Sequence, residues 1–170
     1  MNIENLFAGI DIVKPLIQLD LSLSSPAEII LAGSAVPILA GCEFRNTADI
    51  DFAFLPSAEV CTVINQTPEL RRVFDFNAQG IIGLLEDTED RLVGVDLGLS
   101  RLTVKRLSLM DWVVSKLASP KLEDALNVKE VTLDMLLDIE RNFHLYCGVS
   151  IDRAFADLQY LIREMKDRDS

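Results

Sequence analysis

The chain has 170 residues, the length of one domain or of a small domain with a helical appendage. Hydrophobic residues make up 49%, which excludes a disordered chain, and the formal charge of −11 argues against a protein that grips a nucleic-acid backbone. No apolar run approaches the ~20 residues needed to cross a bilayer, and the first residues lack the pattern of a signal peptide. We therefore expect a cytoplasmic protein with no membrane contact.

The first half of the chain predicts alternating helices and strands from its apolar spacing. In chain order the expected segments are a helix over residues 2–13, a strand over 27–32, a helix over 34–42, a strand over 49–54, a helix over 57–65 and a further helix from 67. Pro15 is expected to end the first helix. Ser57 is typical of an N-cap, and Thr67-Pro68-Glu69 is typical of a helix start.

The second half predicts strands followed by helices. The expected segments are strands over 80–85, 91–97 and 102–107, and helices over 108–117, from 132 to a stop at Gly148, and over 150–165. Ser108 with Asp111 resembles a capping box, and Thr132 and Ser150 are typical N-caps. The expected fold class is α/β (α+β), with a mixed sheet flanked by helices and a helical C-terminal part. We expect a core over residues 1–130 and a helical extension of the same compact unit over residues 131–170.

Chemistry concentrates between residues 33 and 51. Gly33-Ser34 stands where a predicted strand turns into a predicted helix, and free backbone N–H groups there favour a phosphate. Asp49 and Asp51 are two residues apart on a predicted strand, so both carboxylates are expected on the same face. Either feature alone is usually a turn or a solvated surface, but the combination is far more specific.

The carboxylate pair is unfavourable without a counterion. At ~4 Å the repulsion between two charges is about 1 kcal/mol in water and about 4 kcal/mol at an effective dielectric constant of 20. A divalent metal relieves it, and Mg²⁺ is normally held by one or two carboxylates together with substrate phosphates. A phosphate-binding turn beside a carboxylate pair is what metal-assisted phosphoryl or nucleotidyl transfer requires.

The segment resembles the signature of the DNA polymerase β-like nucleotidyltransferase superfamily, in which a Gly-Gly or Gly-Ser turn and a short helix precede two acidic residues one apart. The run Arg45-Asn46-Thr47-Ala48-Asp49-Ile50-Asp51 is especially similar to small prokaryotic members associated with toxin–antitoxin or abortive-infection loci. Downstream, the strand at 89–93 and the segment Ser108 to Leu117 resemble the strand and helix of those proteins. The resemblance covers residues 27–130.

The resemblance implies transfer of a nucleotidyl group from a nucleoside triphosphate (NTP), with Mg²⁺ or Mn²⁺ ions. In that reading Gly33 and Ser34 bind the triphosphate, and Asp49 and Asp51 bind the metals. A third carboxylate, which activates the acceptor hydroxyl and shares the metal, is assigned to Asp96, with Asp75 as the runner-up. The implied phosphate-binding cations are Lys116 and Arg45; the latter is equally typical of a surface loop.

The sequence also departs from these relatives. Where they continue with a basic run after the Lys-Leu pair, this chain has Ala118-Ser119-Pro120-Lys121-Leu122-Glu123-Asp124. With the net charge, this makes a protein or small-molecule acceptor more probable than a nucleic acid. The alternative is a non-catalytic, antitoxin-like module that binds a protein partner on the same scaffold. Zinc hydrolase and cysteine protease chemistry lack support, because His144 is the only histidine.

Overall fold

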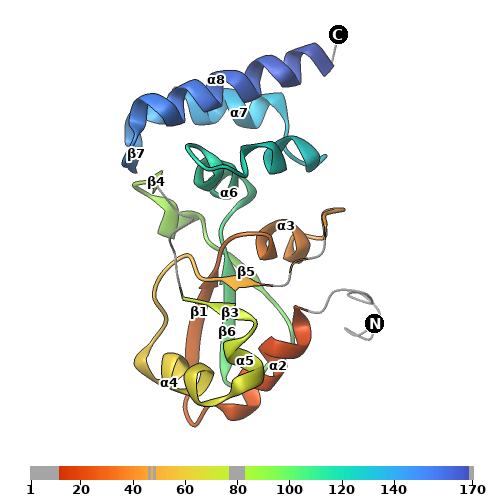
Figure 1. Ribbon diagram of the computed structural model, residues 1–170, viewed down its shortest axis with the longest axis vertical. Helices are drawn as coiled ribbons and strands as arrows, with labels where there is room; N and C mark the ends of the chain where they lie inside the picture. The colour runs from red at the N-terminus through yellow and green to blue at the C-terminus, as the bar shows by residue number, and fades with distance from the viewer. Residues whose placement is uncertain (1–11, 46, 48, 77–82, 169–170) are drawn as a thin grey trace.

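The computed structural model describes residues 12–45, 47, 49–76 and 83–168 (Figure 1). The helices are α2 (Val13–Ser22), α3 (Ala35–Leu39), α4 (Ala58–Gln66), α5 (Pro68–Arg71), α6 (Leu109–Lys116), α7 (Leu133–Arg141) and α8 (Ile151–Arg168). The strands are β1 (Ala27–Leu31), β2 (Ile50–Asp51), β3 (Phe74–Asp75), β4 (Gly83–Leu85), β5 (Val93–Val95), β6 (Leu102–Arg106) and β7 (Tyr146–Gly148). Short 3₁₀ turns are η2 (Thr88–Arg91), η3 (Leu122–Asn127) and η4 (Phe143–Leu145).

The sheet is mixed. Strands β1, β6 and β5 lie side by side in that order, with β1 parallel and β5 antiparallel to β6. Strands β2 and β3 are parallel to each other, and β2 meets β1 through an antiparallel bridge between Leu31 and Phe52. The backbone N–H of Ala32 donates to the carbonyl oxygen of Asp51 at 2.9 Å, and that of Ala53 to Ile30 at 2.8 Å. The sequence prediction of a mixed sheet flanked by helices is therefore confirmed.

Two hydrophobic clusters lie on either side of the candidate site. One packs α2, α4 and α5 against the sheet, and its fully buried members include Leu16, Leu19 and Ile64. The other lies among α6, α7 and α8, around Trp112 and Leu136. In Figure 1 the helices of the first cluster, α2, α4 and α5, lie in the lower half of the molecule, and α6, α7 and α8 lie in the upper half. The second cluster contains residues from before and after residue 130, so the predicted division into a core over 1–130 and an extension over 131–170 stays a prediction.

Strands β4 and β7 connect the middle of the chain to its end. They pair antiparallel, with Leu85 opposite Tyr146 and Gly83 opposite Gly148. The sequence predicted a single helix from 132 to Gly148, which is wrong: α7 ends at Arg141, and η4 and β7 follow. Pairing with a distant strand decides this segment, and helical spacing does not encode such pairing. Within the described residues, no helix has the length and apolar character to span a membrane.

The N-terminal prediction fails at Pro15. Most of the helix predicted over residues 2–13 lies outside the described residues, and so does the 80–82 part of the predicted strand. A helix instead runs through Pro15, which occupies the first turn of α2. Proline is tolerated there because the first N–H groups of a helix have no partner within the helix.

A buried ion pair fixes α6. The carboxylate of Asp111, which has no exposed surface, accepts from Arg91 Nη2 at 2.8 Å and Nε at 3.1 Å. The hydroxyls of Ser108 and Thr88 also donate to it. The backbone N–H of Asp111 in turn donates to the Ser108 hydroxyl, which confirms Ser108 as the N-cap; the Asp111 carboxylate accepts from that hydroxyl instead of completing a capping box with the Ser108 backbone N–H. These bonds hold the helix that ends in Lys116 at a defined position above the sheet.

Candidate functional site

The turn after β1 brings a bare α-carbon against a carboxylate. Gly33 has a φ of +59°, a conformation that other residues avoid. A Cβ placed on Gly33 would lie 1.9 Å from Oδ2 of Asp51, so only glycine permits this contact. Ser34 follows, buried, at the start of α3. Because α3 has five residues, its dipole is weaker than the sequence prediction assumed, and the glycine is the main feature of the turn.

Asp75 is the closest acidic neighbour of Asp51 on the sheet. The two residues are register partners on the parallel strands β2 and β3, so their side chains project from the same face. Burial and then the charge of Asp75 raise the pKa of Asp51, while Lys121 and Lys116 oppose this rise. The structure thus brings the runner-up of the sequence prediction beside Asp51.

Asp49 lies at the edge of this group. It is exposed and precedes the two-residue strand β2. The Thr47 hydroxyl accepts from the Asp49 backbone N–H at 3.3 Å and donates to its carbonyl oxygen at 2.9 Å. The charge of Asp49 also raises the pKa of Asp51, but less than Asp75 does. Asp49 therefore adds negative charge on the solvent-exposed side of the candidate site, whereas Asp51 and Asp75 are half-buried.

The structure does not bring Asp96 to this group. Asp96 follows β5, which is separated from β2 by β6 and β1, about 14 Å across the sheet at ordinary strand spacing. It also lies near the start of β1, whereas Asp51 is beside the end of that strand. Its Oδ1 accepts the backbone N–H of Gly98 at 3.0 Å. Asp96 and Asp51 are too far apart to share one metal ion.

Lys116 and Arg45 converge on a carboxylate that sequence reasoning did not assign. Asp124, in η3, accepts from Arg45 Nη2 at 3.0 Å, and Lys116 Nζ lies 3.5 Å from the same oxygen. The side chains of Lys116 and Asp124 are 8% and 14% exposed. Burial lowers the pKa of Lys116, and the charge of Asp124 opposes that effect. Asp124 is the last residue of the segment 118–124, where this chain differs from the proteins it resembles. No motif therefore pointed to Asp124, and its acidic side chain was the only signal in the sequence.

The turn that follows Lys116 is held by the C-terminal helix. Ala118 has a φ of +59°, and its backbone N–H donates to Oδ2 of Asp157 in α8 at 2.8 Å. A non-glycine residue in this conformation is strained, and the bond from α8 helps to maintain it. The same turn leads to Lys121, whose charge acts on Asp51. Helix α8 therefore positions the basic side of the candidate site.

The donor set decides which metal site is chemically reasonable. Among residues 12–45, 47, 49–76 and 83–168, no cluster of three or more histidine, cysteine or acidic side chains is arranged to hold a metal. Asp51 and Asp75 nevertheless offer two hard oxygen donors on one face. Mg²⁺ commonly takes one or two carboxylates and completes its shell with phosphate oxygens and water. The residues present fit such a shared site rather than a site made by protein alone.

With this geometry described, comparison with known proteins becomes informative. Residues 10–167 match the model of the family described as "Nucleotidyltransferase of unknown function (DUF6036)". The chain belongs to this family. No curated protein and no solved structure matches the chain.

The nucleotidyltransferase family covers more of the chain than the sequence motifs did. The motifs extend over residues 27–130, whereas the family match also includes α7 and most of α8. Those helices are therefore part of the nucleotidyltransferase-like scaffold that the family shares. The description specifies no metal, acceptor or genetic context.

Proposed function

We propose that this chain transfers a nucleotidyl group from an NTP to an acceptor hydroxyl and releases pyrophosphate, with Mg²⁺ or Mn²⁺. The observation that carries the proposal is the half-buried pair Asp51 and Asp75, with Asp51 pressed against the bare α-carbon of Gly33. No described residue donates a hydrogen bond to the Asp51 carboxylate. An acid left in this state costs stability, so a ligand that neutralises it is the simplest reason for its presence.

Each residue has a defined task in this proposal. The turn at Gly33-Ser34 receives the triphosphate, because a glycine lets an anion approach the backbone closely. Asp51 and Asp75 would hold the divalent cation, which when bound offsets negative charge on the phosphates, and Asp49 lies at the entrance. Lys116 and Arg45 would exchange Asp124 for phosphate oxygens. Asp75 takes the place of Asp96 as the base that accepts the proton of the acceptor hydroxyl.

The acceptor follows from charge. A net charge of −11 disfavours a polyanion, so we propose a protein or a small molecule as the acceptor. A role in a toxin–antitoxin or phage-defence system would agree with the sequence resemblance.

One observation favours a second candidate, a non-catalytic module that binds a protein partner. Lys116 and Lys121 already reduce the negative potential at Asp51, and Asp124 occupies both Arg45 and Lys116. A site neutralised by its own side chains needs no metal. The two candidates differ in whether Mn²⁺ and NTP bind.

Thermal unfolding distinguishes them. Wild-type protein and Asp51→Asn are melted in EDTA, in Mn²⁺, and in Mn²⁺ with a non-hydrolysable NTP. The enzyme proposal expects the wild type to gain stability, about 2.7 kcal/mol at a hundredfold excess of ligand over Kd, and the variant to lose most of that gain. If the wild type shows no shift in any ligand, or Asp51→Asn keeps the full shift, the metal site is refuted and the second candidate stands.

Transfer assays test the choice of base. With an NTP labelled in its α-phosphate and cell extract as the source of acceptor, Asp75→Asn should bind NTP but lose at least about a hundredfold in transfer. Asp96→Asn is the matched control and should transfer normally. A dead Asp96→Asn beside an active Asp75→Asn would reverse the assignment.

A further inference from the structure

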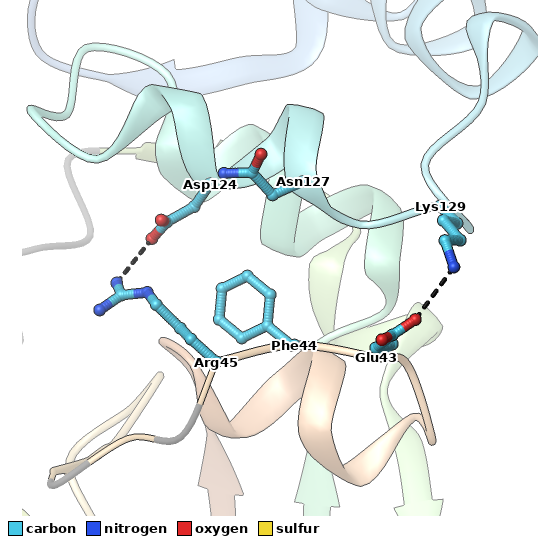
Figure 2. A pocket seen from close by; sticks show the side chains of 6 residues that line it. All are labelled: Glu43, Phe44, Arg45, Asp124, Asn127 and Lys129. Atoms are coloured by element: carbon cyan, nitrogen blue, oxygen red, sulfur yellow. Dashed lines mark hydrogen bonds and ion pairs between the residues drawn. The ribbon is translucent and has the colours of Figure 1, made fainter.

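A pocket of about 600 Å³ adjoins the candidate site (Figure 2). Its lining comes from the loop after α3 and from the segment that begins with η3: Glu43, Phe44, Arg45, Asp124, Asn127 and Lys129. The volume lies within the range of small-molecule sites. Asp124 belongs to this pocket and also contacts Lys116, so the pocket is continuous with the proposed phosphate-binding cations.

All four charged lining groups are already paired. Glu43 and Lys129 form an ion pair of 2.9 Å on one side of the pocket, and Arg45 and Asp124 form one of 3.0 Å on the other, as Figure 2 shows. Between the two pairs lie the ring of Phe44 and the amide of Asn127. The groups left for a ligand are therefore one aromatic ring and one amide.

Both groups are placed for recognition. The Phe44 ring makes an edge contact with buried Trp112, with centroids 5.8 Å apart and planes at 87°, which fixes its orientation. Arg45 Cζ lies 5.7 Å from the Phe44 centroid. Asn127 is exposed, and its amide forms no hydrogen bond with the described residues. An aromatic ring and a guanidinium favour a flat π-system, and an amide pairs with an edge that has a donor beside an acceptor.

A nucleobase combines these properties: a flat π-system with adjacent donors and acceptors on its edge. We propose that the pocket binds the base of the nucleotide substrate, with Phe44 contacting the ring system and Asn127 the polar edge. This inference rests on the proposed nucleotidyltransferase function and adds where the base is recognised. Arg45 marks the boundary between the base and the phosphates, since it belongs to both groups.

Calorimetry separates base recognition from phosphate recognition. The probes are inorganic tripolyphosphate and the α,β-methylene analogues of ATP, GTP, CTP and UTP, which cannot donate a nucleotidyl group, each with Mg²⁺. At least one analogue should bind the wild type about tenfold or more tighter than tripolyphosphate does.

Variants of the two lining groups test the pocket itself. Asn127→Ala should weaken the binding of that analogue about fivefold and leave the binding of tripolyphosphate unchanged. Phe44→Leu, which keeps an apolar side chain against Trp112, should weaken it about tenfold. Asn65→Ala, an exposed asparagine on α4, is the matched control and should bind like the wild type.

The outcomes distinguish the two levels of the proposal. If tripolyphosphate and all four analogues bind equally tightly, or if both variants bind like the wild type, the base pocket is refuted and the phosphate site stands. The base pocket is also refuted if the variants slow transfer without weakening nucleotide binding, because the pocket would then serve the acceptor. If no probe binds the wild type, both the pocket assignment and the proposed function fail.

Discussion

Asp20 on helix α2 and Asp51 on strand β2 are both carboxylates withdrawn from solvent, and their surroundings are opposite. Asp20 is 5% exposed, and its carboxylate accepts the backbone N–H groups of Ser100, Arg101 and Leu102 at 2.7–3.2 Å. Burial raises its pKa, but these bonds outweigh burial, and the pKa is lowered. Asp51 has an acid beside it, no described hydrogen-bond donor, and a raised pKa. The acid that supports the fold is fully partnered, whereas the acid proposed to bind a ligand is not.

The largest expected effect tests the partnered side of this comparison. Asp20→Ala leaves buried N–H groups of residues 100–102 without an acceptor, and should lower the free energy of unfolding by about 3 kcal/mol or more. Urea denaturation measures the loss. Asp138→Ala is the control, because its pair with Arg141 is exposed, and should cost less than about 0.5 kcal/mol. Equal losses would show that Asp20 does not support the start of β6.

Two glycines test the contact of Asp51 with the turn. Gly33→Ala adds backbone strain and a Cβ that collides with Asp51, and should cost about 2–3 kcal/mol and abolish nucleotide binding. Gly41→Ala has a φ of +78° but no atom within 4 Å of its Cβ, so it should cost about 1 kcal/mol and keep binding. Urea denaturation and calorimetry give the two readouts. Equal behaviour of both variants would remove the Gly33–Asp51 contact from the site.

A smaller effect, in the opposite direction, is expected on the basic side of the site. Ala118→Gly removes the strain of the positive φ after Lys116, which should raise the free energy of unfolding by about 1 kcal/mol. The greater conformational entropy of glycine in the unfolded chain reduces this gain. Ala156→Gly, an exposed position within α8, is the control and should lose about 1 kcal/mol. A loss at Ala118 as large as that at Ala156 would contradict strain in the turn.

The smallest effect is the pH dependence of Asp51, because solvent screens a half-buried group. Its folded pKa is raised above 3.8, so below pH 3.8 the side chain is neutral in both states and costs nothing. As the pH rises through the folded pKa, the wild type becomes charged and loses stability. The advantage of metal-free Asp51→Asn should therefore be absent in acid and reach a plateau at neutral pH.

Urea denaturation of both proteins at a series of pH values measures this difference. Asp20→Asn serves as the comparison, because the pKa of Asp20 is lowered whereas that of Asp51 is raised. The lowered pKa of Asp20 stabilises the wild type above pH 3.8, and that contribution disappears as the pH falls through the folded pKa. An advantage of Asp51→Asn that does not change with pH would contradict the raised pKa.

Local features of the fold could be predicted from the sequence, because neighbouring residues determine them. Ser57, Ser108 and Thr132 were predicted as N-caps, and each side chain accepts the backbone N–H three residues later. The helix start at Pro68 is also confirmed, with Thr67 as the N-cap residue but without a hydrogen bond from its side chain. Partly buried strands such as β1 and β6 were recognisable from short runs of apolar or alternating residues.

The position of Asp75 beside Asp51 could not be predicted with the same certainty. It depends on the parallel register of β2 and β3, two short strands separated by α4 and α5, and no local pattern specifies that register. Asp96 was the better motif match but follows the far edge strand. The pairing of β4 with β7 is hidden for the same reason, since these strands are far apart in the chain. Metal binding and the roles of the site residues stay predictions.

The bond between Ala118 and Asp157 joins two parts of the chain that the ribosome synthesises at different times. Translation adds about 5–20 residues per second, so roughly 5–20 s separate the synthesis of Asp51 from that of Asp157. For most of this interval Asp51 and Asp75 have both been synthesised, while the lysine turn lacks the helix that contacts it. A polypeptide released before residue 157 would keep the acids but not the fixed positive charges that oppose them. If the proposed triphosphate site is correct, it is complete only late in synthesis, after α8 has been made.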